Sequence, residues 1–322
     1  MNSINHYREE FLAHLRTSVA VKEPRNLYEP IDYILQLGGK RLRPVLTLVA
    51  TDLFGGDYRK ALPAAAAVEV FHNFSLVHDD IMDNASLRRG KATVHQKWNS
   101  NIAILSGDAM LICAYRLLES YPPDTFAALA KLFSKTALEV CEGQQWDMDF
   151  ETQAQVSIPQ YLQMIRYKTA VLVGAALQMG AIIAEASIEN QRLIYDFGVT
   201  IGLAFQLQDD YLDTFGDEAF GKKIGGDILE NKKTILYLKA LDLADEAQRN
   251  TLIAQYTTSE ENDAKIAIVT QLFRQTGAAE AVRDEITRTT DEALNLLEHI
   301  TISDENRAYL KQFALELMNR KV

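Results

Sequence analysis

Hydrophobic residues recur along nearly the whole chain at the three- and four-residue spacing of amphipathic helices. No run shows the strict alternation of a half-buried strand, and the seven prolines and sixteen glycines fall at breaks between apolar runs. The pattern predicts an all-α fold, a bundle of about ten or more helices. With no linker-like or low-complexity segment, residues 1–322 are expected to form a single domain. Predicted helices span 4–19, 31–37, 44–54, 62–83, 101–120, 126–149, 159–186 and 191–215, with a polar loop over 84–97 and further helices from residue 232.

The helix predicted over 62–83 is hydrophobic on nearly every side until it reaches its aspartates, which is typical of a helix surrounded by others. Asp79 and Asp83 stand four residues apart, so their carboxylates project from one face, one turn apart. Asp209 and Asp213 repeat this spacing in the sequence QLQDDYLD.

Magnesium is the ion that these carboxylate pairs suit, because Mg2+ takes one or two carboxylates together with phosphate oxygens and water. A single DDxxD is more often a solvated, acidic helix end. Two copies on two apolar helices make that alternative unfavourable, because charge is seldom placed beside a core without a partner. The clusters therefore predict Mg2+ ions that clamp a diphosphate.

Basic residues lie close to both motifs and suit anionic groups. Lys40 and Arg43 follow a glycine break at a predicted helix start, where backbone N–H groups add to an anion site. Taken alone, GGKRLRP is more often a solvated helix start. Arg88 and Arg89 directly follow the first aspartates, and we expect one guanidinium to face a metal-bound diphosphate and the other a second anion.

Other polar positions leave alternatives open. Lys223 and Lys232 follow the second aspartate cluster, and alone they fit a mobile basic loop equally well. Asp108 lies in a helix expected to be buried, where a structural hydrogen-bond acceptor is the favoured interpretation. The 144–149 segment, QQWDMD, fits inward-facing polar groups and ordinary helix surface alike. His95 and the C-terminal Arg320-Lys321 pair receive no firm role.

Composition narrows the class of protein. A net charge of −11 argues against a nucleic-acid partner, but it does not exclude a phosphorylated substrate because Mg2+ inverts the local field. Cys113 and Cys141 lie in apolar surroundings and are expected to be core residues in a reducing compartment. No signal peptide is visible, and the longest mainly apolar stretch, Val171–Ala184, is shorter than the ~20 residues of a membrane span. We expect a soluble, cytoplasmic protein.

Five ordered segments between residues 38 and 234 resemble the trans-isoprenyl diphosphate synthase (polyprenyl synthetase) family. They are GGKRLRP, LVHDDIMDNASLRRG, KT at 168–169, FQLQDDYLD and GKKIGGDILENKKT. Together they are highly specific, whereas the flanking helices match only in general character. The resemblance implies the isoprenoid synthase fold, a helical bundle around a deep central cavity. It also implies head-to-tail condensation of isopentenyl diphosphate with an allylic diphosphate, commonly by a homodimer.

The resemblance also implies roles for particular residues. About two or three Mg2+ ions would be held by Asp79, Asp83 and Asp209. The phosphates of the allylic substrate would contact Arg88, Lys168, Lys223 and Lys232. Isopentenyl diphosphate would bind in a metal-free basic site of Gly39, Lys40, Arg43, His72 and Arg89. The carbocation left when diphosphate departs would be stabilised by the dipoles of Thr169 and Gln206, which with Lys168 form the catalytic set.

Departures from the family pattern are slight. Ala92 stands where many relatives have proline, which should affect only the stiffness of the loop. Lys222 and Lys223 are adjacent, and spacing favours Lys223 as the phosphate ligand.

Product length is expected to depend on residues before Asp79. Phe74 lies five positions before Asp79 and Phe71 three further back, so both rings can share its face. In the family, a bulky aromatic residue five positions before the motif accompanies short products, and the insertion typical of bacterial farnesyl synthases is absent here. The resemblance is to geranylgeranyl synthases, which predicts a C20 product, with C15 next. The alternatives are that both rings are plain core, or that the product is longer.

Three other functions compete with this interpretation. A class I terpene cyclase normally carries an Asn/Asp-Ser/Thr-Glu second metal motif and has no isopentenyl site, whereas this chain has QDDYLD and GGKRLRP. A non-catalytic subunit of a heteromeric synthase tends to lose one aspartate cluster, and both are present. An acidic helical scaffold that binds divalent ions incidentally is the third. Chain elongation from an allylic primer distinguishes the synthase from all three.

Overall fold

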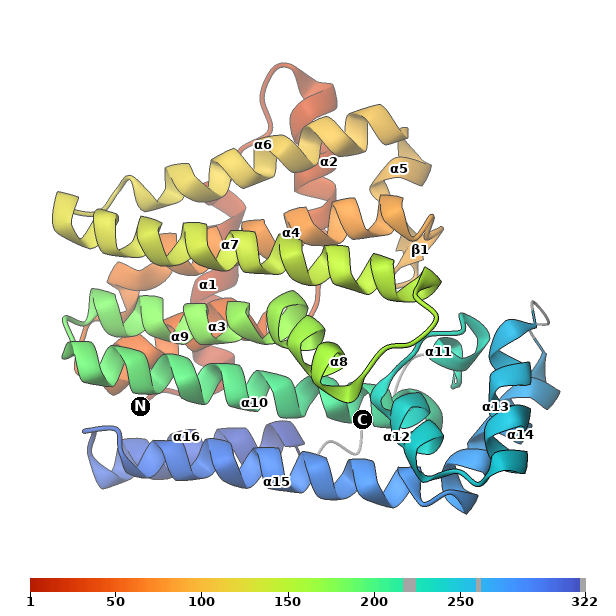
Figure 1. The fold of residues 1–322 in the computed structure, drawn as a ribbon. Coiled ribbons are helices and arrows are strands. Elements are labelled where there is room, and N and C mark those ends of the chain that lie inside the picture. The colour runs from red at the N-terminus through yellow and green to blue at the C-terminus, as the bar shows by residue number, and fades with distance from the viewer. Residues whose placement is uncertain (217–223, 259–261, 319–322) are drawn as a thin grey trace. The chain divides into compact units, whose positions relative to one another are not determined.

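The computed structural model describes residues 1–216, 224–258 and 262–318, and these residues are mostly helical. The only strands among them are two residues long, so the all-α prediction is confirmed. The chain forms two compact units, drawn as one ribbon in Figure 1. The first comprises residues 1–136 and 172–195, and the second comprises 137–171 and 196–322. The single domain expected from the sequence stays a prediction.

The first unit is built from the N-terminal helices and a later return of the chain. Its elements are α1 (Ile4–Ser18), α2 (Arg25–Gln36), α3 (Leu42–Leu53), the 3-10 turn η1 (Tyr58–Ala61), α4 (Leu62–Met82), β1 (Leu87–Arg88), β2 (Lys91–Ala92), α5 (Val94–Lys97) and α6 (Ser100–Leu118), with the first part of α7 (Pro123–Thr152), most of α9 (Val171–Ile183) and the start of α10 (Ile188–Phe215).

Helix α4 is the centre of the first unit. It contacts α1, α2, α3, α5 and α6, and the longest contact is with α6, which runs alongside it (Figure 1). The four alanines at 64–67 are fully buried, and their short side chains let neighbouring helices approach closely. The predicted central helix is therefore confirmed, and its C-terminal end carries the first aspartate motif.

A buried ion pair fixes the segment between α2 and α3. The Arg41 guanidinium donates to the Glu69 carboxylate of α4 and to the carbonyl of Leu35 at the end of α2. The amide of Asn73 donates to the same Glu69 carboxylate oxygen at 2.9 Å. Breaking such a pair leaves one charge buried without a partner, at about 3–5 kcal/mol. Of the three basic residues in GGKRLRP, Arg41 is thus structural, and its buried side chain fixes the backbone that carries Lys40 and Arg43.

The polar loop predicted over 84–97 is more ordered than expected. Leu87 pairs with Ala92 and Arg88 with Lys91 in an antiparallel hairpin. Arg89 and Gly90 form its turn, both with positive φ, 53° and 73°, which is the two-residue turn that suits a hairpin twist. The sequence prediction missed the hairpin because its strands are too short to show alternation.

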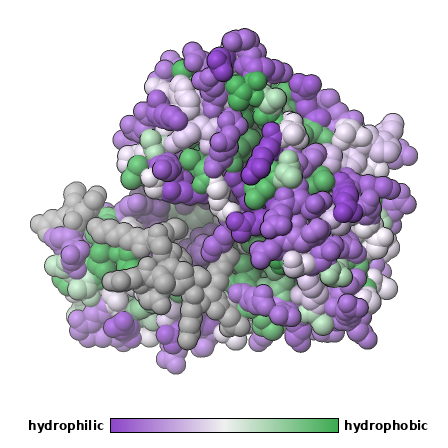
Figure 2. Space-filling view, turned by 180° about the vertical axis from the view of Figure 1, so that it is seen from behind, coloured by the Kyte–Doolittle hydropathy of each residue, from purple (hydrophilic) through white to green (hydrophobic). Residues whose placement is uncertain are grey.

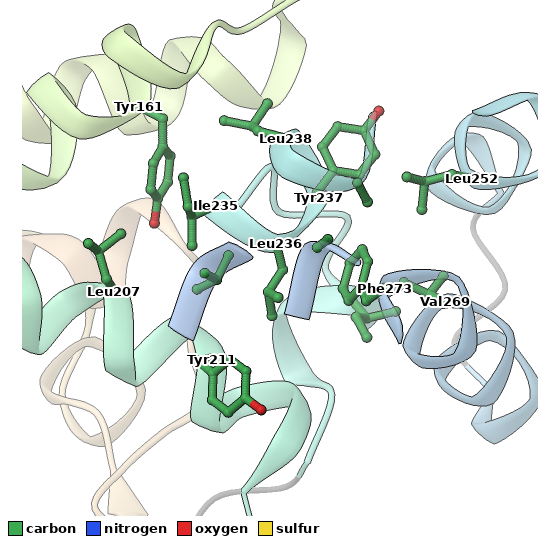
Figure 3. Close-up of a cluster of buried hydrophobic side chains, with 14 of the residues drawn as sticks. Tyr161, Leu207, Tyr211, Ile235, Leu236, Tyr237, Leu238, Leu252, Val269 and Phe273 are labelled. Atoms are coloured by element: carbon green, nitrogen blue, oxygen red, sulfur yellow. The ribbon is translucent and has the colours of Figure 1, made fainter. Parts of the chain in front are cut away.

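The second unit is organised around a cluster of buried hydrophobic side chains that is drawn in Figure 3. Its elements include the rest of α7 and α10 with α8 (Ile158–Ile165), the π-helical turn η2 (Arg166–Ala170), α11 (Gly226–Leu229), α12 (Ile235–Leu243), α13 (Glu246–Thr257), α14 (Asp263–Gln275), α15 (Ala278–Glu298) and α16 (Asp304–Met318). Helix α12 lies in the middle of the cluster, with Leu236 fully buried between Tyr211 of α10 and Phe273 of α14.

Several predicted helix boundaries need correction. Helix α2 begins at Arg25 rather than 31, with Pro30 inside it. Pro30 is buried, so packing offsets the one hydrogen bond that a proline cannot donate. The helix predicted over 159–186 is broken by the π-helical turn at 166–170. Helix α7 is longer than the predicted 126–149 because Pro123 occupies its first position, where its missing N–H has no partner in any case.

Helix α6 was expected to be buried, and this is wrong for one of its faces. Gly107, Met110 and Ala114 face the core, whereas Leu105 and Ile112 are 60% and 59% exposed. By length and composition alone, this is the one described helix that would suffice to cross a membrane, and 33% of its apolar window is buried. On the side of the molecule seen in Figure 2, most surface residues are hydrophilic, with hydrophobic ones in patches between them.

Candidate active-site residues

The predicted basic residues of the first unit come together around a histidine. The Arg43 guanidinium lies 3.4 Å from Nε2 of His72, which is on α4. Burial lowers the pKa of His72 well below its usual value, and the charges of Arg43 and Arg89 lower it further. His72 is therefore neutral at pH 7 and presents a ring nitrogen beside concentrated positive charge. Such a cluster is suited to a multiply charged anion.

Gly39 leaves space for the guanidinium of Arg89, which packs against its backbone. The Arg89 guanidinium donates to the carbonyl of Gly38. A side chain at Gly39, whose φ is +117°, would place its Cβ 2.9 Å from Cζ of Arg89. Burial lowers the pKa of Arg89, and the neighbouring charge of Arg41 adds to this effect. The hairpin turn thus delivers Arg89 to the segment that carries Lys40, which is exposed.

The first aspartate motif divides its carboxylates between two tasks. Asp80 is buried and accepts a 2.8 Å hydrogen bond from Nε of Arg88, while the second guanidinium nitrogen reaches Asp79 at 3.3 Å. Burial raises the pKa of Asp80, and the charge of Arg88 partly offsets this. Asp79 and Asp83 lie on the more open face, with the Asp79 side chain 17% exposed and Asp83 exposed.

The second motif likewise has buried carboxylates that are hydrogen-bonded within the protein and one that is more accessible. Asp210 is buried, accepts a hydrogen bond from the Tyr161 hydroxyl, and accepts another from the Gln206 amide at 3.0 Å. Burial raises the pKa of Asp210 to about 8, and the charge of Asp227 adds to the rise. Asp213 is also buried and accepts the backbone N–H of Asp227 at 3.0 Å. Asp209 is the most accessible of the three carboxylates, and its predicted role as a metal ligand stays a prediction.

Lys168 and Thr169 lie on the π-helical turn, next to α7. The Lys168 ammonium pairs with Asp147 at 2.5 Å, and the Thr169 hydroxyl donates to the amide oxygen of Gln206 at 3.2 Å. Gly143 permits this packing, since a Cβ there would lie 2.2 Å from the backbone nitrogen of Lys168. The insertion of one residue into a helix at such a turn is common at functional sites. All three predicted catalytic residues are thus neighbours within the second unit.

Of the two predicted loop lysines, one lies among the described residues. Lys232 is 45% exposed and contacts Glu230 at 2.7 Å and Asp227 at 3.9 Å. Burial opposes its charge, but the hydrogen bond to Glu230 and the charges of Glu230 and Asp227 outweigh this and raise the pKa of Lys232. Lys223 lies outside the described residues, as does the Arg320-Lys321 pair.

The donor set fits Mg2+ that is shared with a substrate. Among residues 1–216, 224–258 and 262–318, no three carboxylate, imidazole or thiol side chains converge as a ready-made metal site. Asp79 and Asp83 nevertheless supply two hard oxygen ligands one turn apart. The Asp80 carboxylate between them in the sequence accepts a hydrogen bond from Arg88. Mg2+ commonly binds to one or two carboxylates and takes its remaining ligands from phosphate and water.

The aromatic residues before Asp79 form a continuous stack in the first unit. The ring centroids of Phe71 and Phe74 are 5.5 Å apart, and Phe71 contacts Phe133 of α7 at 5.2 Å. Phe133 in turn meets Tyr115 of α6 at 4.8 Å. Phe71 is fully buried and Phe74 is 8% exposed, so a part of the Phe74 surface remains accessible.

Other expectations require correction. Asp108 is not in a buried setting: its side chain is 61% exposed and lies 3.9 Å from Nε2 of His78. Cys141 is exposed rather than a core residue, although both cysteines are free, as expected. His95 is half-buried and contacts Gln96 at 3.4 Å. A cavity of about 620 Å³ in the second unit contains none of the predicted site residues and is lined mainly by α14.

Comparison with known proteins identifies the family. The polyprenyl synthetase family model matches residues 24–273. The short chain isoprenyl diphosphate synthase of Methanothermobacter thermautotrophicus is 36% identical over 321 residues, which are 98% of each chain. The crystal structure of a geranylgeranyl pyrophosphate synthase is 53% identical, covers 100% of both chains and gives a TM-score of 0.96. The geranylgeranyl pyrophosphate synthase from Corynebacterium glutamicum, crystallised with isoprenyl diphosphate and magnesium, is 29% identical over 98% of both chains, with a TM-score of 0.86. The chain therefore belongs to the polyprenyl synthetase family, and the resemblance inferred from its sequence is confirmed.

Sequence reasoning missed the residues that support the site. Asp147, which pairs with Lys168, belongs to the QQWDMD segment, whose pattern fits an inward and a surface position alike. Tyr161 carries no sequence signal, because its partner Asp210 is 49 residues away. Gly143 is recognisable only once α7 and the π-helical turn are in contact.

A pH-dependent stability is expected from Asp210. Its folded pKa of about 8 lies above the usual value of about 4, so between these values the folded protein holds a proton that the unfolded chain has released. This stabilisation is complete below about pH 4 and is lost as the pH rises through 8, by up to about 1.4 kcal/mol per unit. Asp210→Asn, which cannot ionise, should lack this decline.

The measurement is urea unfolding of the metal-free protein at acid, neutral and mildly alkaline pH. The free energy of unfolding of Asp210→Asn should improve relative to the wild type as the pH rises. Asp291→Asn, at an exposed site on α15, serves as the control and should show no such trend. A difference between Asp210→Asn and wild type that does not change with pH would contradict the raised pKa.

Proposed function

We propose that this protein condenses isopentenyl diphosphate head-to-tail with an allylic diphosphate to form a short-chain all-trans prenyl diphosphate of C20, or C15. The observation that carries the proposal is the gathering of Arg43, His72 and Arg89 into a basic cluster on the same unit as the Asp79–Asp83 pair. One unit thus presents two different means of binding diphosphate, as two diphosphate substrates require. Family membership supports the same reaction.

The two anion sites are assigned different substrates. Isopentenyl diphosphate binds to Lys40, Arg43, Arg89 and neutral His72, where guanidinium groups replace the need for a metal. Asp79, Asp83 and Asp209 hold Mg2+ on the diphosphate of the allylic substrate. When bound, Mg2+ supplies positive charge that favours departure of the diphosphate. The cationic groups that contact this diphosphate are Arg88, Lys168, Lys223 and Lys232.

The remaining residues act on the carbocation that is left. The Thr169 hydroxyl donates to Gln206, and their oxygens orient negative dipole ends that stabilise developing positive charge. The double bond of isopentenyl diphosphate attacks the cation, and the released diphosphate accepts the proton that is then lost. Tyr161 and Asp210 hold the Gln206 amide in place through the hydrogen bond between Asp210 and Gln206.

We further propose a homodimer that works in the cytoplasm. Leu105 and Ile112 are seven residues apart, so both lie exposed on one face of α6, and contact with a second copy would remove their apolar surface from water. A second copy of α6 is a self-complementary partner for this face. The free thiols of Cys113 and Cys141 suit a reducing compartment. Recovery of the native protein from a membrane or secreted fraction would contradict this location.

Catalysis is tested with purified protein, Mg2+, isopentenyl diphosphate and dimethylallyl, geranyl or farnesyl diphosphate. We expect chain elongation that chelation of Mg2+ abolishes. Asp79→Ala should lower the rate by roughly a hundredfold or more, because it removes charge stabilisation of the leaving group. Asp291→Ala, on an exposed face, should retain the wild-type rate. No elongation with any primer would refute the proposed function, and full activity of Asp79→Ala would remove its metal role.

Product length is tested by Phe74→Ala. Removing this ring opens space before Phe71, so the main product should lengthen by at least one isoprenyl unit, as chromatography of the dephosphorylated products would reveal. Phe11→Leu, at a fully buried position on α1, controls for loosened packing and should leave the product unchanged. An unchanged product from Phe74→Ala would instead assign both rings to the core.

The dimer is tested by sedimentation equilibrium at micromolar concentration. The wild type should sediment as a dimer, and the double variant Leu105→Glu, Ile112→Glu should be monomeric because it places carboxylates in the proposed interface. Ile188→Glu, at a residue that is 78% exposed elsewhere, should remain dimeric. A monomeric wild type, or a dimeric double variant, would disprove this interface.

A further inference from the structure

The segment between α11 and α12 delivers Lys232 from a short, irregular stretch of backbone. Lys232 lies at the surface, and its N–H donates to the carbonyl of Asp227 at 2.9 Å. Thr234 then donates to the carbonyl of Lys232, also at 2.9 Å, immediately before α12 begins. A long, exposed lysine side chain reaches a defined point only if its backbone is held firmly.

Lys233, the next residue, is anchored by its side chain. Its ammonium donates to the carbonyl oxygens of Phe150 at 2.7 Å, Glu151 at 3.3 Å and Gln153 at 2.5 Å. Phe150 and Glu151 lie in the last turn of α7 and Gln153 follows its end, where the helix dipole favours a cation and the last carbonyls have no helical partner. Three acceptors match the three N–H groups of one ammonium.

A second anchor lies on the other side of Lys232. Asn231 has a positive φ of 57°, and its side chain accepts a 2.7 Å hydrogen bond from the ammonium of buried Lys265 on α14. The Asn231 amide also donates to the carbonyl of Thr258 at 3.4 Å. Lys232 therefore lies between two residues whose side chains are fixed to other elements of the same unit.

The end of α7 also fixes Lys168. Asp147 of α7 pairs with Lys168 at 2.5 Å, and the same helix continues to the carbonyls that bind Lys233. The backbone attachment of one proposed phosphate ligand and the side-chain partner of another are thus both on α7, within about two turns. Helix α12, directly after Lys233, is seated in the hydrophobic cluster of Figure 3, which limits how the segment can move.

We propose that Lys233 is a positioning residue for the allylic diphosphate site: it fastens the backbone beside Lys232 to the end of α7, so that Lys232 meets the diphosphate at a set distance from Lys168. Lys233 itself contacts no substrate, since its N–H groups are engaged by the α7 carbonyls. This inference rests on the proposed function, because it takes Lys232 as a phosphate ligand.

The alternative is that Lys233 merely caps α7 and contributes to stability alone. The two roles differ in which substrate is affected and in whether the effect passes through Lys232. A positioning role predicts weaker binding of the allylic diphosphate, with binding of isopentenyl diphosphate unaffected. It also predicts that the effect vanishes once the Lys232 ammonium has been removed.

The experiment compares Lys233→Met, Lys233→Arg and Lys232→Ala with the double variant Lys232→Ala, Lys233→Met. Lys233→Met should raise KM for the allylic diphosphate about tenfold, because a displaced Lys232 would lose about one charge-assisted hydrogen bond to the substrate. KM for isopentenyl diphosphate should be unchanged. Lys233→Arg, which keeps cationic donors at the carbonyls, should restore most of the affinity. The double variant should equal Lys232→Ala. Lys311→Met, at an exposed site on α16, is the matched control and should equal the wild type.

Calorimetric titration with inorganic diphosphate and Mg2+ provides a readout that does not depend on turnover, and it should give the same order of affinities. A Lys233→Met protein with lower Tm but wild-type KM and diphosphate affinity would overturn the proposal, as would additive effects in the double variant. If Lys233→Met fails to fold, Lys233→Gln, which keeps the donors without the charge, is judged by the same criteria. A wild type that binds diphosphate but elongates no primer would refute the proposed function instead.

Discussion

Pairing of cations with carboxylates is the interaction on which the proposed site residues of both units depend. Glu69 holds Arg41, Asp80 holds Arg88, and Asp147 holds Lys168. A cationic side chain is long and loses considerable conformational entropy when it is fixed, so a site that must bind phosphates needs partners that fix it in advance. Glu69 and Asp80 in turn are buried, and a cation compensates the charge of each carboxylate.

Both aspartate motifs use their second member for structure. Asp80 is committed to Arg88 and Asp210 to Tyr161, so neither presents an open carboxylate. The first member, Asp79 or Asp209, is less buried than the second and is the one to which the metal role is assigned in the proposed function. This arrangement explains why two adjacent aspartates can be tolerated at the end of an apolar helix: one of the two charges is neutralised within the protein, and its pKa is raised by burial.

Glycines at the close contacts are as important as the charged residues. Gly39 leaves room for the Arg89 guanidinium, and Gly143 for the backbone of Lys168. A methyl group at either position would displace a cation from its partner, and an error of about 1 Å is enough to weaken a preorganised site. The backbone at these glycines therefore determines where the neighbouring charged side chains can lie.

The sequence by itself determined the fold class, the family and the residue types of the chemistry. Helical periodicity and the spacing of Asp79 and Asp83 are local properties, and local hydrogen bonding and side-chain direction follow from them. The order of five motifs then identified the family, which the comparisons confirm.

Only the tertiary structure decided which charged groups are internal to the protein. The pairs Arg41–Glu69, Tyr161–Asp210 and Lys233 with the end of α7 join residues far apart in the chain, and no local pattern encodes such contacts. The hairpin at Arg88 and the π-helical turn at Lys168 were likewise invisible, because one strand pair and one inserted residue leave the hydrophobic period unchanged. Burial, which depends on packing across the whole unit, separates Asp80 and Asp210 from the less buried Asp79 and Asp209.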